Sequence, residues 1–399
     1  MQLDWLNRLN LKTRSQPILL ILLLLIIFGC RPVIKPPQFP AEPTIRVALL
    51  TDQERVAVTA TGPFTIYSGN KKETLSSGKI CRISYLNTIT VQGAIWLKTA
   101  NFPIQIKVES NGLVSVANRT YRGYLEIRKN PTGKLTVINI LPLEKYLFGV
   151  VPCEIGGLNE KTFEAGKAQA IAARSYALSH LGWFSQLGFD VFATYQRDQE
   201  YRGKSAETEM TNKAVLATYG VVALYRNKII EAKYHSTCGG HTIGGKAPYL
   251  RALPDTPGHR KGKKPFCFHS PHYTWRKSIS IGNFLKAMIK VIPNFKPKAK
   301  IRAIRLEKDR RTQRNRFVNI LTNRERYKIK SEDFRRALEL KTNFYSVTKS
   351  HRAINITGHG YGHGIGLCQY GALGMAKQGY KSEAIIQHYY PKTKLKRIY

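Results

Sequence analysis

The chain has 399 residues, of which 43% are hydrophobic and 22% are charged, close to a globular average, and this composition excludes wholesale disorder. Lys and Arg number 64 against 25 Asp and Glu, and the formal net charge of +39 predicts a polyanionic partner: nucleic acid, an anionic membrane face or a cell-wall polymer. The length allows two or more hydrophobic cores, and six cysteines are too few for a small scaffold built on disulfides.

The N-terminus predicts export. Lys12 and Arg14 precede an apolar run over residues 18–28, which is shorter than the roughly 20 residues of a membrane-spanning helix but typical of a secretory signal. Cys30 follows Ile27-Phe28-Gly29, and this segment resembles a bacterial lipoprotein box, in which the cysteine is acylated and becomes the mature N-terminus. An uncleaved anchor or a plain signal peptide is the alternative. We therefore expect a protein of the cell envelope, attached to the membrane by its N-terminus, without a nucleic-acid partner.

The next part of the chain has the pattern of a linker followed by strands. Residues 31–43 contain five prolines and predict an extended linker. Short runs rich in Val, Ile and Thr follow, separated by turns of Gly, Asn and Pro. They predict strands over residues 45–50, 55–59, 64–67, 89–98, 104–108 and 135–140.

Helical patterns dominate later in the chain. The longest is Ala-rich and free of proline, over residues 160–181, and shorter ones cover 205–217 and 282–291. Near the end, Ser382 is expected to cap a helix that Pro391 stops. A β-rich N-terminal part followed by a mixed part with a long Ala-rich helix predicts the α+β class rather than alternating βαβ units.

Arg174 occupies an unusual position on the Ala-rich helix. At 100° per residue it falls in the centre of a stripe that includes Phe163, Ile171 and Leu178. An arginine on a core-facing stripe must be paired or hydrogen-bonded. Backbone carbonyls could satisfy it, or it could point into a cleft and hold a carboxylate of the protein or of a substrate.

Glu154 ends an apolar segment, residues 147–154, and Gly156-Gly157 follow it. Apolar neighbours would raise the pKa of its carboxyl and keep it protonated near neutral pH, as a general acid requires. A helix cap or a surface acid is the ordinary alternative.

A glycine-rich segment lies near the C-terminus. Glycines alternate with larger residues over 358–366, which removes Cβ atoms on one side and allows close approach of another backbone or of a polymer ligand. His359, Tyr361 and His363 lie within this segment, and Gln369 opens a short helix behind it. We expect these four residues to line a substrate groove, although the histidines could instead hydrogen-bond to turn backbone.

Two further clusters carry chemistry. His235, Cys238 and His241, with Cys267 downstream, offer the nitrogen and sulfur ligands that zinc favours, although a Cys238–Cys267 disulfide is the competing interpretation. Tyr273 and Trp275 have faces that suit sugar rings and equally suit a core.

Four segments together resemble the sporulation stage II protein D family (SpoIID/LytB-like). They cover residues 141–154, 167–177, 234–240 and 360–372 in the order that the family has them, within a similarity that extends over roughly 135–399. The N-terminal patterns give a signal over 1–30 and a linker over 31–43, and the resemblance implies an accessory β-rich region over 44–140 and a catalytic domain over 141–399.

The resemblance also implies an activity. Family members are exported lytic transglycosylases of peptidoglycan, whose catalytic Glu maps onto Glu154 and whose helix Arg maps onto Arg174, expected to orient Glu154 or to bind a substrate carboxylate. Some members carry zinc near the position of His235. The expected reaction cleaves the β-1,4 bond between N-acetylmuramic acid and N-acetylglucosamine and leaves a 1,6-anhydro end. Other members enhance an N-acetylmuramoyl-L-alanine amidase, so a non-catalytic wall-binding protein that activates such an amidase is the alternative.

Overall fold

The computed structural model describes residues 38–91, 94–296 and 300–399. The expected signal, the lipidation site Cys30 and the linker up to residue 37 lie outside these residues and stay predictions. Within the described ranges, no helix is long and apolar enough to cross a membrane.

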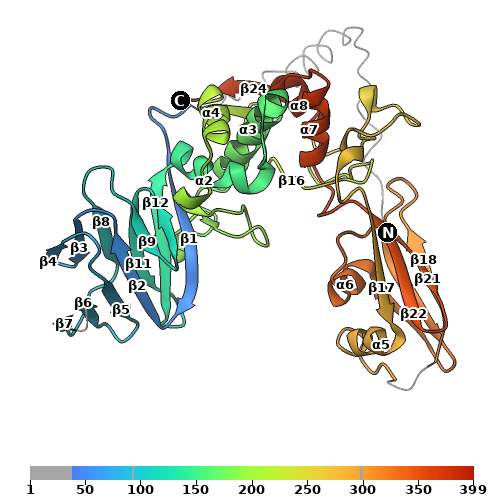
Figure 1. Cartoon of the computed structure of the whole chain (residues 1–399), viewed down its shortest axis with the longest axis horizontal. Helices are drawn as coiled ribbons and strands as arrows, with labels where there is room; N and C mark the ends of the chain where they lie inside the picture. The colour runs from blue at the N-terminus through green and yellow to red at the C-terminus, as the bar shows by residue number, and fades with distance from the viewer. Residues whose placement is uncertain (1–37, 92–93, 297–299) are drawn as a thin grey trace, which may run out of the picture. The chain divides into compact units, whose positions relative to one another are not determined.

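Two sheets form the first part of the described chain (Figure 1). Both contribute side chains to one hydrophobic core. The larger sheet has the order β13 (Val191–Phe192), β1 (Thr44–Gln53), β12 (Leu135–Pro142), β11 (Tyr124–Lys129), β8 (Ile104–Val108), β3 (Phe64–Ser68), β4 (Lys71–Leu75). The smaller sheet has the order β10 (Arg119–Tyr121), β9 (Val114–Val116), β2 (Arg55–Ala60), β5 (Cys81–Ser84), β6 (Ile89–Val91), β7 (Ala94–Leu97).

The same core continues into a group of helices. Its buried residues run from Ile45 in β1 to Ile398 at the C-terminus. The helices are α2 (Leu143–Ile155), α3 (Phe163–Ser179), α4 (Glu209–Ala217), α7 (Gln369–Lys377) and α8 (Ser382–Tyr389). Two small sheets complete this part: β15 (Lys228–Ile229), β14 (Val221–Tyr225) and β24 (Lys394–Arg397), and the parallel pair β16 (Tyr234–His235) and β23 (Leu367–Cys368). The predicted boundary between residues 140 and 141 stays a prediction.

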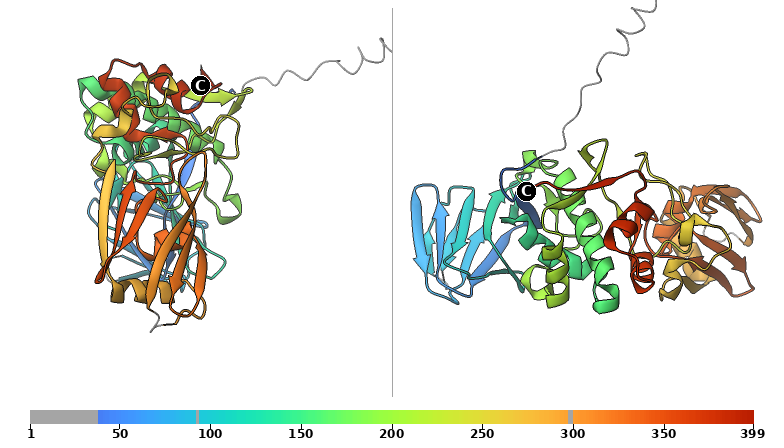
Figure 2. Two further views of the ribbon diagram at one scale, coloured as in Figure 1. Left: turned by 90° about the vertical axis from the view of Figure 1, so that its right-hand side faces the viewer. Right: turned by 90° about the horizontal axis from the view of Figure 1, so that it is seen from above.

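A second hydrophobic core lies within residues 275–356. It is enclosed by the sheet β17 (Thr274–Ser280), β22 (Ala353–His359), β21 (Tyr345–Lys349), the sheet β18 (Ile301–Lys308), β19 (Asn315–Thr322), β20 (Arg326–Lys330), and the helices α5 (Ile281–Ile289) and α6 (Ser331–Ala337). The orange strands of this region stay adjacent in both views of Figure 2. The α+β prediction is confirmed.

Helix α2 is the main element that the sequence analysis did not assign. Its buried residues include Leu143, Tyr146, Leu147 and Val150, so most of its surface faces other elements and no polar stripe marks it as helical. Gly149 and Pro152 inside the helix further weaken its helical propensity. Tertiary packing therefore stabilises this helix more than its local sequence does. The helix carries Glu154 in its last turn.

The expected cap of helix α8 is wrong in detail. Ser382 is the first helical residue and Lys381 is the N-cap, without a side-chain cap hydrogen bond. The backbone N–H of Ser382 instead donates to Glu164 at 2.8 Å, so a carboxylate from α3 satisfies this end of the helix.

The glycines of residues 358–366 allow two stretches of backbone to lie close together. Gly360, Gly362, Gly364 and Gly366 all have positive φ, from 71° to 100°. A Cβ at Gly366 would overlap the carbonyl oxygen of Lys233, which precedes β16. These glycines thus hold the segment against the strand that begins the 234–240 motif.

Replacing Gly366 by Ala should therefore destabilise the chain strongly. Left-handed backbone alone costs about 1–2 kcal/mol for a residue with a Cβ, and the overlap with Lys233 adds to that cost. Gly379→Ala is the matched control, because Gly379 also has positive φ but a Cβ there meets nothing within 4 Å. Urea unfolding should show a clearly larger loss for Gly366→Ala, and equal losses would contradict the close-approach explanation.

Candidate active site

Glu154 lines a groove of about 1370 Å³. Helix α2 supplies Glu154 at its end, where the chain turns away at Gly156. Strand β16, which pairs with β23, supplies Tyr234 and His235, and the start of α7 supplies Gln369. The groove extends to β19 and α6 of the second core region, so its walls come from segments far apart in the sequence.

The carboxylate of Glu154 is half-buried and held by two hydrogen bonds. The backbone N–H of Glu200 donates to Oε1 at 3.0 Å, and Nε2 of Gln369 donates to Oε2 at 3.0 Å. Burial raises the pKa of Glu154, against the opposing effect of these two donors. Among the described residues Glu154 makes no ion pair, which leaves its carboxyl able to exchange a proton.

A chain of hydrogen bonds leads from the core toward Glu154. Tyr146 donates to Oε1 of Gln199 at 3.1 Å, and Nε2 of Gln199 donates to the hydroxyl of Tyr234 at 2.7 Å. The hydroxyl of Tyr234 acts on Glu154 and lowers the pKa of its carboxyl. The carboxylate is thus oriented by side chains that packing itself fixes.

Positive charge dominates the lining of the groove. Nine Arg and Lys side chains line it against five acids. One of those acids, Glu332, is paired with Arg335 at 2.7 Å, and this contact lowers its pKa, whereas burial raises that of Glu154. The pKa values of two carboxyls of one groove are thus shifted in opposite directions, and Glu154 is the one suited to a general acid.

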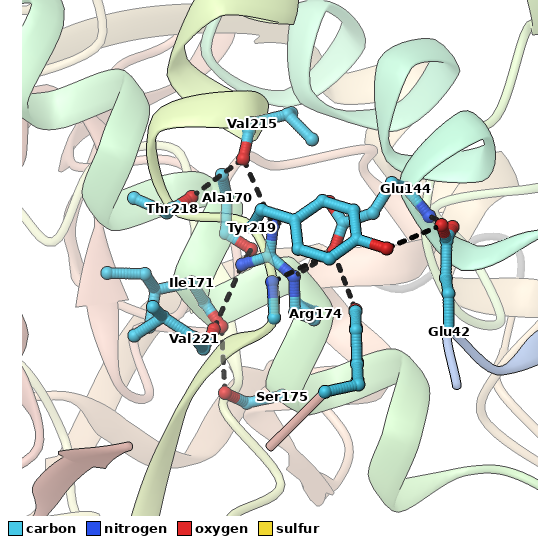
Figure 3. A network of polar contacts seen from close by, with 12 residues as sticks. Glu42, Glu144, Ala170, Ile171, Arg174, Ser175, Val215, Thr218, Tyr219 and Val221 are labelled. Atoms are coloured by element: carbon cyan, nitrogen blue, oxygen red, sulfur yellow. Dashed lines mark hydrogen bonds and ion pairs between the residues drawn. The ribbon is translucent and has the colours of Figure 1, made fainter. Parts of the chain in front are cut away.

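Arg174 does not serve the groove, which corrects its expected role. The guanidinium is fully buried and forms a two-point ion pair with Glu144, with both N–O distances at 2.7 Å (Figure 3). Its remaining N–H groups donate to backbone carbonyls, including that of Val221 at 2.9 Å. The hydroxyl of Tyr399 donates to the same Glu144 carboxylate at 2.6 Å. Arg174 therefore joins α2, α3, β14 and the C-terminus and has no donor left for Glu154 or a substrate.

Of the other residues predicted to line the groove, three line it and His359 does not. Tyr361 and His363 line the groove, and so does Gln369. His359 ends β22, outside the lining, with Nδ1 3.2 Å from the hydroxyl of Thr274.

Neither of the two predicted aromatic sugar platforms lines the groove. Trp275 is 8% exposed, belongs to the second core and donates from its indole N–H to the carbonyl of Gly360 at 2.8 Å. Tyr273 packs partly buried against the first core. Both therefore serve packing, and the aromatic lining comes instead from tyrosines such as Tyr176, Tyr195 and Tyr370.

The four predicted zinc ligands do not converge. Cys238 and Cys267 lie together, with their sulfurs 3.4 Å apart. His235 is buried elsewhere, where Nδ1 hydrogen-bonds to the carbonyl of Ile365 at 3.1 Å, and Nδ1 of His241 lies 2.6 Å from the carbonyl of Thr242. The residues that do join the two cysteines are Cys368 and Asp255.

Several residues that matter for the site or its surroundings were not identified from the sequence. Glu144 lies in the 141–154 motif and could have been paired with Arg174, since a core-facing arginine needs a carboxylate. Gln199 and Glu200 lie in a segment without a recognisable pattern, and only the fold brings them to α2. Cys368 stands between the glycine-rich segment and Gln369, and its proximity to the other cysteines carries no signal in the sequence.

Fold and groove define an α+β protein with a basic groove and an acid of raised pKa at the end of a helix. The family model described as Stage II sporulation protein matches residues 131–225, which include Glu154 and Arg174. The Stage II sporulation protein D of Bacillus amyloliquefaciens is 31% identical, over 65% of this chain and 75% of that protein. The chain belongs to the stage II sporulation protein D family.

Two further relatives extend the comparison. An uncharacterized protein of Brachyspira hyodysenteriae is 28% identical over 88% of this chain and 92% of its own length. A Bacillus subtilis protein named amidase enhancer is 27% identical over 62% of this chain and 40% of its own length. The match to the first of these takes in nearly the whole chain, including most of what the family model leaves out.

Proposed function

We propose that this protein is a lytic transglycosylase of the cell wall, with Glu154 as its general acid and base. The observation that carries the proposal is the position of Glu154: a half-buried carboxyl of raised pKa, without an ionic partner among the described residues, in a groove of about 1370 Å³. The basic lining suits the anionic peptides that glycan strands of peptidoglycan carry.

The reaction would use one carboxyl twice. Glu154 first gives its proton to the glycosidic oxygen as the bond from C1 of N-acetylmuramic acid to that oxygen breaks. The 6-hydroxyl of the same muramic acid then attacks C1, and its proton passes to the Glu154 carboxylate. The products are a free 4-hydroxyl and a 1,6-anhydro end, and no water is consumed. A second carboxyl to activate water, as hydrolases use, is not needed.

Gln369 should tune the acid. Its amide donates to the ionised form of Glu154 and lowers the pKa, so Gln369→Leu should raise the pKa of Glu154. Because the first step needs the protonated carboxyl, the limb of the pH–rate profile where activity falls with rising pH should move to higher pH. Rates on glycan strands across pH, with Gln378→Leu outside the groove as control, would test this, and an unmoved limb would contradict it.

A second candidate function is enhancement of an amidase without catalysis. The specific observation in its favour is the similarity to the Bacillus subtilis protein named amidase enhancer. The purified chain would then release no anhydro-sugars by itself and would accelerate an N-acetylmuramoyl-L-alanine amidase. Digestion of peptide-free glycan strands by the chain alone separates the two functions, because such strands contain no amidase substrate.

The location of the protein is part of the proposal. Peptidoglycan lies outside the cytoplasmic membrane, so a transglycosylase must be exported. The N-terminal segment with Cys30 would supply the signal and the membrane attachment. Mass analysis of the mature N-terminus would show whether Cys30 is acylated.

A further inference from the structure

Three cysteines and one aspartate form a compact cluster that is not part of the groove lining. Cys238, Cys267, Cys368 and Asp255 are buried, and their ligand atoms lie within 4.8 Å of one another. They come from the loop after β16, the short helix η5 (Phe266–His269), β23 and the loop before η5. A tetrahedral zinc ion with bonds of about 2.3 Å to sulfur spaces its sulfur ligands about 3.8 Å apart, so little movement is needed to hold one.

The sulfur of Cys368 already accepts two backbone hydrogen bonds. The N–H groups of Cys238 and Gly371 donate to it at 3.2 and 3.3 Å. Hydrogen bonds to a ligand atom orient that ligand for a metal ion.

The acid of the cluster has no cationic partner among the described residues. Asp255 is fully buried and accepts from the hydroxyl of Tyr389 at 2.6 Å and from the N–H of Cys267 at 3.0 Å. No Lys or Arg pairs with it among the described residues, and Nε2 of His388 lies 3.8 Å away, too far for a hydrogen bond. Buried acids are commonly paired with a cation or bound to a metal ion, and a divalent metal would supply the cation that is lacking here.

Arg314, next to the cluster, is placed to neutralise part of the charge of a metal site. It is 6% exposed and donates to the carbonyl of Cys238 at 2.8 Å, and it interacts electrostatically with all three cysteines. Within the described ranges it makes no ion pair with a carboxylate. Zinc with three thiolates and one carboxylate carries a net charge of −2, and the Arg314 guanidinium would partly neutralise it.

We propose that Cys238, Cys267, Cys368 and Asp255 bind one zinc ion with a structural role. A Cys238–Cys267 disulfide, the competing arrangement, would leave the Cys368 thiol and the Asp255 carboxylate without a purpose. The ion would tie together the loop after β16, the segment that leads into η5, and β23. Cys368 immediately precedes Gln369, the donor to Glu154. The site would hold Gln369 in place without touching the substrate, and it does not depend on the function proposed above.

The test measures metal, not activity. The full chain is purified from zinc-supplemented cells, dialysed and analysed for elements. We expect about one zinc ion per chain, which a thiol-blocking mercurial releases. Cys238→Ser, Cys267→Ser and Cys368→Ser should each lose the zinc, whereas Cys81→Ala, at a buried cysteine in β5, should keep it.

A second measurement covers variants that fail to fold. Wild-type chain is alkylated without reduction and its peptides are mapped by mass spectrometry. A linked pair of Cys238 and Cys267 peptides at full yield would overturn the proposal. So would a wild-type chain with less than half an equivalent of zinc after incubation with zinc under reducing conditions.

Discussion

Glu154→Gln is expected to abolish most of the glycan cleavage. The amide of Gln cannot supply or take the proton, and general acid–base catalysis by one side chain is worth roughly 10²–10⁴-fold in rate. The measurement is the release of anhydro-muropeptides or anhydro-sugars from purified strands. Glu209→Gln, at an exposed acid of α4 that pairs with Lys213, is the matched control and should keep the wild-type rate. An undiminished rate in Glu154→Gln would remove Glu154 from the mechanism.

The same variant should remain folded, and its stability should depend on pH in a defined direction. Burial raises the pKa of Glu154 in the folded chain, so ionising this carboxyl costs stability, and the cost grows as the pH rises through the folded-state pKa. Gln carries no such cost. Glu154→Gln should therefore be more stable than wild type above neutral pH and similar to it in acid, and urea unfolding at the two pH values would show this difference.

Breaking the Arg174–Glu144 pair should give the largest loss of stability. Arg174→Met leaves the Glu144 carboxylate buried without its cation, and removal of one partner of a buried pair typically costs about 3–5 kcal/mol. Glu144→Leu should cost a similar amount. The free energy of unfolding, measured in urea, is the appropriate readout.

The double variant tests whether Arg174 stabilises the fold through Glu144 or acts in the groove. If the two side chains act on each other, Arg174→Met combined with Glu144→Leu should cost clearly less than the sum of the single variants. Glu209→Gln breaks an exposed pair in α4 and should change little. Additive losses, or a loss of glycan binding without a loss of stability in Arg174→Met, would contradict the assignment of Arg174 to the fold.

Local patterns predicted much of the fold. The strand expected over 104–108 coincides with β8, and the Ala-rich pattern predicted α3 within a few residues. Helix α2 did not stand out, because it is buried on most sides and contains Gly149 and Pro152. Its stability comes from packing against elements that are distant in the sequence.

Properties of single site residues could be predicted from their sequence neighbours, whereas their partners could not. An acid in an apolar segment predicted a raised pKa for Glu154, in agreement with the effect of burial in the structure. Arg174 needed a partner, but the sequence could not decide which carboxylate it would find. The cysteine cluster required the meeting of three segments that are distant in the sequence, and neither spacing nor composition contains that information.

The most direct test of the central claim is mass analysis of the products that purified wild-type chain forms from peptide-free glycan strands, without any amidase. The account predicts fragments that end in 1,6-anhydro-N-acetylmuramic acid, each lighter by one water than a hydrolysis product. Reducing muramic acid ends would instead indicate a hydrolase, and intact strands would leave the enhancement of an amidase as the function of this chain.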